Sequence, residues 1–115
     1  MAKIRVLTEF GMGTSLRRQD YTQAARRGLQ DALWHNSINM AELFGFEKES
    51  MIIDVEIGVQ DPSAVDTDSL HDIFPYGQPN ITAVKGGLDV PRPVGNPTVI
   101  ANVALSVSFN MEPAS

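Results

Sequence analysis

Apolar and polar residues alternate in four segments of the chain, and a period of two predicts β-strands with one buried face. The four segments are residues 3–10, 51–59, 80–85 and 98–109. The last is the longest, with an apolar residue at every odd position from Val99 to Phe109. Gly11-Met12-Gly13 follows the first segment and is expected to form a loop, while Gly86-Gly87 ends the third.

A helical period replaces the alternation after the first strand. One stripe recurs at helical spacing from Tyr21 to Asn36, preceded by Asp20, which is suited to cap a helix, with Gln23 three positions later. The stripe contains four small residues: Ala24, Ala25, Gly28 and Ala32. Small side chains allow a helix to lie close to a sheet. A second, shorter helix is predicted at residues 66–74, before Pro75.

These elements follow the order β-α-β-α-β-β. They predict a single α+β domain over residues 1–115, in which a four-stranded mixed sheet carries both helices on one face. In the first strand, the alternation places Ile4, Val6, Thr8 and Phe10 on one face and Lys3, Arg5, Leu7 and Glu9 on the other. Leu7, Ile52 and Val84 would then lie among charged residues on the uncovered face. Another subunit is the natural cover, so we expect a homo-oligomer, either a trimer or a multiple of it.

Composition and charge narrow the classes of function. The chain carries a formal net charge of −5, which argues against a basic surface for nucleic acid or for an anionic membrane. It has no cysteine, so disulfides, thiolate catalysis and cysteine-based zinc sites are excluded, and its two histidines show no metal-ligand spacing. We therefore expect no metal and no cofactor. Without a signal peptide or a membrane-length apolar run, the expected location is the cytoplasm.

Five short motifs stand out along the chain: Gly11-Met12-Gly13, residues 19–25, His35-Asn36-Ser37, Phe74-Pro75-Tyr76-Gly77 and Gly86-Gly87-Leu88. Together they resemble the Lin0512 family of small proteins without an assigned function. The family pattern near the N-terminus is Gly-x-Gly-x-Asp-x-His-Gly, and this chain departs from it with Ser15, Arg17 and Arg18 at the last three fixed positions. The element order also resembles the chorismate-mutase-like and YjgF-like folds, which implies trimers with ligand pockets between subunits.

The loop from Gly11 to Asp20 is the leading candidate for a ligand site. Gly11 and Gly13 would let the backbone approach a ligand, and the following helix N-terminus favours an anion. Thr14 and Ser15 add hydroxyl groups, while Arg17 and Arg18 add donors suited to carboxylate or phosphate. The predicted function is therefore binding of a small anionic metabolite between subunits. The alternative is a plain connection whose arginines pair with acids of a neighbouring subunit, in a self-assembling protein without a ligand.

Four residues are weaker candidates for catalysis. Asp20 is either a general base or a helix cap, and His35 is either a functional residue or a cation favoured by the helix C-terminus. Ser15 and Lys85 would form a nucleophile pair if their loops met. Ring-opening amidohydrolases such as cyanuric acid hydrolase use such pairs, on a fold that resembles repeated units of this kind. Gly86 and Gly87 beside Lys85 either allow close approach to a ligand or form a bulge or turn. Whether the protein is an enzyme stays open at this point.

Overall fold

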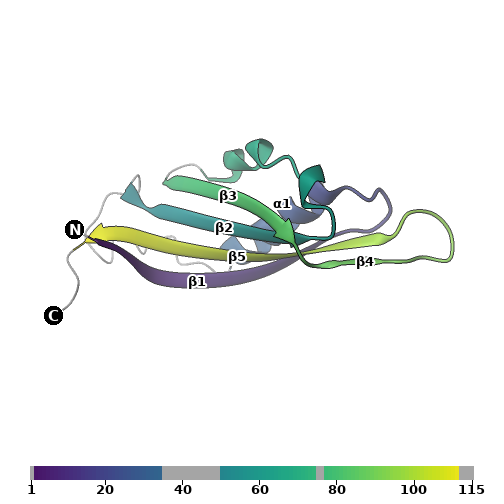
Figure 1. Cartoon of the computed structure of the whole chain (residues 1–115), viewed down its shortest axis with the longest axis horizontal. Coiled ribbons are helices and arrows are strands. Elements are labelled where there is room, and N and C mark those ends of the chain that lie inside the picture. Colours follow the sequence, from purple (N-terminus) through teal and green to yellow (C-terminus); the bar gives the residue numbers. More distant parts are fainter. Residues whose placement is uncertain (1, 35–49, 75–76, 112–115) are drawn as a thin grey trace.

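The structure is a computed structural model that describes residues 2–34, 50–74 and 77–111. The elements are β1 (Ala2–Ser15), α1 (Tyr21–Trp34), β2 (Ile52–Val59), η2 (Pro62–Ala64), η3 (Asp68–Ile73), β3 (Gln78–Lys85), β4 (Leu88–Val90) and β5 (Thr98–Met111). They form a mixed five-stranded sheet in the order β1-β5-β2-β3, with β4 paired to β5 (Figure 1). Among the strand pairs of the described residues, only β2 and β3 run parallel to each other. The α+β class is confirmed.

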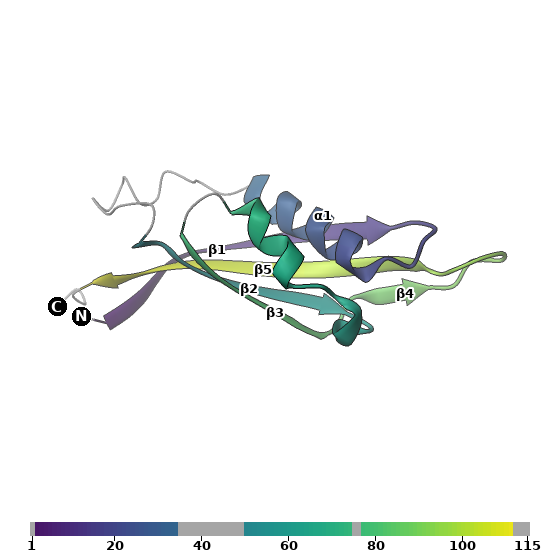
Figure 2. The same cartoon turned by 90° about the horizontal axis from the view of Figure 1, so that it is seen from above.

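The predicted number of strands and the type of the second helix were wrong. The fifth strand, β4, has three residues and pairs with the first residues of β5, so Leu88 lies opposite Ile100 and Val90 opposite Thr98. Three residues are too few to display an alternation. Residues 66–74 hold the 3₁₀ turn η3 in place of an α-helix, although Leu70 is fully buried as its apolar anchor. Figure 2 shows α1 and η3 on one side of the sheet, as expected.

The predicted glycine loop after the first strand is instead part of that strand. β1 continues to Ser15 and pairs with β5 along its whole length. Here α1 rests directly on the strand: a Cβ added to Gly13 would lie 2.2 Å from both the Ala24 oxygen and the Gly28 nitrogen. The glycines therefore bring a helix, and not a ligand, close to the backbone. The small stripe of α1 is buried as predicted, from Ala24 to Ala32.

A register shift between Arg5 and Leu7 reverses the predicted faces of β1. Beyond this bulge, Leu7 lies opposite Val107 on the side that α1 covers, while Phe10 lies opposite Ala104 on the other side. One extra residue in a strand moves every following side chain to the opposite face. Phe10 is consequently 68% exposed. The prediction that Leu7 lies on the uncovered face was therefore wrong.

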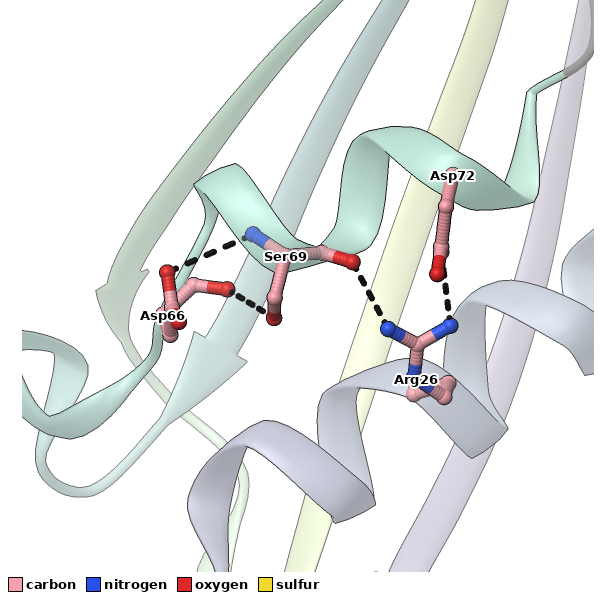
Figure 3. A network of polar contacts seen from close by, with 4 residues as sticks. All are labelled: Arg26, Asp66, Ser69 and Asp72. Atoms are coloured by element: carbon pink, nitrogen blue, oxygen red, sulfur yellow. Dashed lines mark hydrogen bonds and ion pairs between the residues drawn. The ribbon is translucent and has the colours of Figure 1, made fainter.

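Polar contacts fasten α1 to the connection between β2 and β3. Arg26 donates from Nη1 to Asp72 Oδ1 at 2.8 Å and from Nη2 to the Ser69 carbonyl at 2.7 Å (Figure 3). Asp66 fixes the start of the turn, since its Oδ1 accepts a bond from the Ser69 amide at 3.3 Å. The Thr22 hydroxyl accepts a bond from the Asp66 amide at 2.8 Å. These contacts tie the outer side of α1 to the segment that follows β2.

Candidate functional site

An open hollow of about 390 Å³ lies where β1 ends and α1 begins. It is lined by Ser15, Leu16, Arg17, Arg18, Gln23 and Arg27, and we call it the arginine hollow. The sequence pointed to three of these residues. Gln23 and Arg27 were missed as site residues, although their spacing of four places them on the same side of a helix.

The helix start that borders the hollow has the predicted cap. The Asp20 carboxylate accepts a bond from the Gln23 amide at 3.0 Å, which is the contact of an N-cap residue. The Asp20 amide, however, donates to Ser15 Oγ at 3.1 Å rather than to the Gln23 side chain of a capping box. Ser15 is 1% exposed. Its hydroxyl therefore shapes the loop, and the Gln23 side chain is left to line the hollow.

Side chains of the β4–β5 hairpin donate hydrogen bonds to backbone carbonyl groups of the loop between β1 and α1. The Leu16 carbonyl accepts bonds from Thr98 Oγ1 at 3.2 Å and from Arg92 Nη1 at 3.4 Å. The Arg17 carbonyl accepts a bond from Asn96 Nδ2 at 3.4 Å. These contacts fix the backbone and leave both arginine side chains of the loop in solvent. The hairpin extends beyond β2 and β3 at this end of the sheet (Figure 1).

The arginines of the hollow differ in their partners. Arg27 donates from Nη1 to the Thr14 carbonyl at 2.8 Å, which ties it to β1. Within the part of the chain that the structure describes, the guanidinium groups of Arg17 and Arg18 form no hydrogen bond or ion pair. Asp20, the acid nearest in sequence, is used as the helix cap. Two unpaired cations beside a helix N-terminus make this a region of positive potential on an acidic protein.

A tyrosine–carboxylate cluster that the sequence did not indicate lies behind the start of α1. Tyr21 is buried and its hydroxyl donates to Asp89 Oδ2, while Gln19 Nε2 donates to the Tyr21 oxygen at 3.3 Å. The hydrogen bond to the Asp89 carboxylate raises the pKa of Tyr21 above its ordinary value. Asp89 Oδ1 is buried without a hydrogen-bond partner among the described residues. Asp89 belongs to the short strand β4, so only the folded chain brings it to Tyr21.

The remaining predicted site residues do not join this hollow. Lys85, Gly86 and Gly87 line a different hollow of about 300 Å³, so Ser15 and Lys85 are not brought together within one chain. The two glycines form a bend between β3 and β4, which run in the same direction. Gly87 has φ +61° and its Cα faces the Ile100 carbonyl, where an added Cβ would be 2.1 Å from the oxygen. His35 lies outside the described residues.

The described part of the chain gives two further negative findings. It contains no group of three or more His, Asp or Glu side chains placed to bind a metal ion. Its helices include none with the length and apolar character needed to cross a membrane.

Comparison with known proteins identifies the family. The family of conserved hypothetical proteins designated Lin0512_fam matches residues 5–107, and the chain belongs to this family. Among solved structures, the chain is similar to an FtsZ-like protein of unknown function from Nostoc punctiforme PCC 73102, with 29% sequence identity and a TM-score of 0.87. The similarity covers 96% of this chain and 99% of the other. No curated protein matches the chain.

Proposed function

We propose that this member of the Lin0512 family binds a small anion with carboxylate or phosphate groups in the arginine hollow. The observation that carries the proposal is the pair of guanidinium groups on Arg17 and Arg18, which find no acid among the described residues. A guanidinium presents donors in a planar fork that fits the two oxygens of a carboxylate or phosphate. An anion between the two side chains would also interact favourably with the N-terminus of α1.

The surroundings of the two arginines support a ligand rather than chance exposure. The backbone of the loop is tied to Arg92, Asn96 and Thr98, so the positions from which the side chains extend are fixed before an anion arrives. Fixed donors lose less conformational freedom on binding, which favours affinity. Gln23 and Arg27 add donors from the first two turns of α1. The earlier expectation that Gly11 and Gly13 contact the ligand is dropped, because α1 covers them.

Catalysis is no part of the proposal. Ser15 is buried and its Oγ accepts a hydrogen bond from the Asp20 amide, which does not support a role as a nucleophile. The Asp20 carboxylate caps the helix, which does not support a role as a general base. A hydrolase that uses Ser15 and Lys85 would need the two residues from different subunits. The prediction that the ligand lies between subunits of a trimer, by analogy with the chorismate-mutase-like and YjgF-like folds, also stays a proposal. The FtsZ-like neighbour is described as a protein of unknown function and adds no activity.

Thermal unfolding in the presence of anions tests the proposal. Inorganic phosphate and citrate should raise the melting temperature of the wild type above that in sodium chloride of equal ionic strength. The double variant Arg17→Ala, Arg18→Ala should lose this increase. A matched control is Arg5→Ala, Lys85→Ala, which removes the same charge elsewhere and should keep it. Equal melting temperatures in phosphate, citrate and chloride for the wild type would refute the proposal.

A self-assembling protein without a ligand is the second candidate, and a specific observation favours it. Large apolar side chains such as Phe10 and Met12 are 68% and 56% exposed on the face that α1 does not cover. If the Arg17→Ala, Arg18→Ala variant lost its assembly instead of its response to anions, the arginines would be interface residues and this second function would stand.

A further inference from the structure

The face of the sheet opposite α1 carries a raised aromatic side chain between two hollows. Phe10 lines both, one of about 460 Å³ and the other of about 300 Å³. The smaller, which we call the glycine hollow, is lined in part by Gly58, Gly86 and Gly87, so part of its wall is bare backbone. Its volume is at the lower end of the roughly 300–1,000 Å³ typical of sites that accept small organic groups. The same face thus presents both an exposed ring and a space.

Apolar side chains continue this surface toward the β4–β5 hairpin. Met12 follows Phe10 on the same side of β1, and the register of β4 places Leu88 and Val90 on the side of Ile100 and Thr98. Met12 is 56% exposed and Leu88 is 58% exposed. Figure 2 shows α1 on the opposite side of the sheet, and the exposed fractions indicate that no described element covers these residues. An exposed cluster of this kind marks a contact surface.

The charges on this face are of both signs. Arg5 and Glu56 line the larger hollow, and Glu56 and Lys85 line the glycine hollow. None of these three side chains forms an ion pair with another described residue. A surface that offers an unpaired cation beside an unpaired anion is complementary in charge to a copy of itself. A uniformly acidic or basic partner would leave part of it unpaired.

The exposed edge of β1 is less available for a contact than the face. Asp31 Oδ2 accepts a bond from the Met12 amide at 3.0 Å, and Arg27 donates to the Thr14 carbonyl at 2.8 Å. Both backbone groups lie on the edge of β1 away from β5, and α1 satisfies them with its own side chains. Groups that are already bonded do not pair with an incoming strand. Association is therefore favoured through the face.

We infer that a second copy of this chain covers the open face, with Phe10 of one copy seated in the glycine hollow of the other. Ring and hollow belong to one surface, so each copy supplies both halves of the contact. The contact closes either as a two-fold pair or as a ring such as the expected trimer. Charged side chains around the hollow would then find partners of opposite sign in the neighbouring copy. This inference concerns the face opposite α1 and does not depend on anion binding.

The molar mass of the purified chain tests the inference. Sedimentation equilibrium at micromolar concentration should give an oligomer for the wild type. Phe10→Ser should raise the dissociation constant by about 30-fold or more, the effect typical of a central aromatic residue of an interface. Val94→Ser is the matched control, because Val94 is 81% exposed in the hairpin loop and should leave the mass unchanged. A monomeric wild type, or a Phe10→Ser variant with wild-type mass, would overturn the inference.

A second variant tests the hollow rather than the ring. A Cβ on Gly58 would make ordinary contacts, the nearest at 3.4 Å from the Gly86 Cα, so Gly58→Ala should fold normally. The added methyl group narrows the glycine hollow and should raise the dissociation constant several-fold. Far-ultraviolet circular dichroism confirms the fold of each variant. A normally folded Gly58→Ala chain that associates as tightly as the wild type would contradict the place assigned to the ring.

Discussion

The two faces of the sheet differ in how many of their side chains are buried or paired within one chain. On the face under α1, the odd-numbered residues of β5 from Val99 to Phe109 are buried, the helix touches the strand backbone at Gly13, and Arg26 is paired. On the opposite face, Phe10 stands in solvent and Arg5 lacks an ion-pair partner among the described residues. Both faces belong to the same strands. The covered face is therefore the one that stabilises the single chain, and the open face is the one for which we propose a contact with a second copy.

The same substitution should destabilise the chain much more on the covered face than on the open face. In Gly13→Ala the new methyl group would lie 2.2 Å from backbone atoms of Ala24 and Gly28, which α1 can relieve only by moving away. We expect a loss of about 3 kcal/mol or more, at the upper end of overpacking costs. In Gly58→Ala the methyl group makes ordinary contacts, and the unfolding free energy of the monomer should change by less than about 1 kcal/mol. Urea unfolding of both variants measures this, and equal losses would contradict the comparison.

Removing an arginine should matter more on the covered face. Arg26→Ala deletes the bonds to Asp72 and the Ser69 carbonyl, and should cost roughly 1–2 kcal/mol, because Asp72 is largely exposed and its share is small. Arg5→Ala should change the unfolding free energy by no more than about 0.5 kcal/mol. Paired urea denaturation curves give both values. A larger loss for Arg5→Ala would mean that the open face is also required for folding of the monomer.

Alkaline pH should lower the stability of the folded chain, because Tyr21 on the covered face loses its proton. Its pKa is raised by the bond to Asp89, so the folded state favours the protonated form. This contribution is fully present below the ordinary tyrosine pKa of about 10 and is lost as the pH rises through the folded value. The wild type should therefore lose stability above about pH 10 relative to Tyr21→Phe, which at neutral pH should itself be about 1 kcal/mol less stable. Melting temperatures across the alkaline range provide the test, and parallel curves for the two chains would argue against the cluster.

The smallest expected effect is a loss of stability at acid pH, through an ion pair on the open face. Lys3 Nζ lies 2.7 Å from Asp54 Oδ2, and this contact lowers the pKa of Asp54. The stabilisation is present above the ordinary aspartate pKa of about 3.9 and is lost as the pH falls through the folded value. Both side chains are more than a third exposed, so the contribution should be below about 1 kcal/mol. Chemical-shift titration of Asp54 checks the direction, and Lys3→Ala should return the pKa toward the ordinary value.

The local pattern of the sequence was sufficient for the elements of the covered face. The small stripe of α1, the Asp20 cap and the alternation of β2 and β5 were all predicted and are confirmed. They were predictable because a helix period, a cap and a strand alternation each depend on residues close together in the chain. The arginine hollow was partly predicted for the same reason, since Arg17 and Arg18 directly precede the cap. Whether it binds an anion stays a prediction.

Tertiary structure decided everything that depended on distant segments. The bulge near Arg5 reversed the faces of β1, and no local signal marks it, because either register keeps an alternating pattern. Gly11 and Gly13 were predicted to form a loop, but they belong to β1 and α1 packs directly against them. Tyr21 and Asp89 are hydrogen-bonded although 68 positions separate them in the sequence. The three residues of β4 form a strand through their pairing with β5. Sequence determines which residues are able to form an element; the competition among elements for the same surface determines which face each residue occupies.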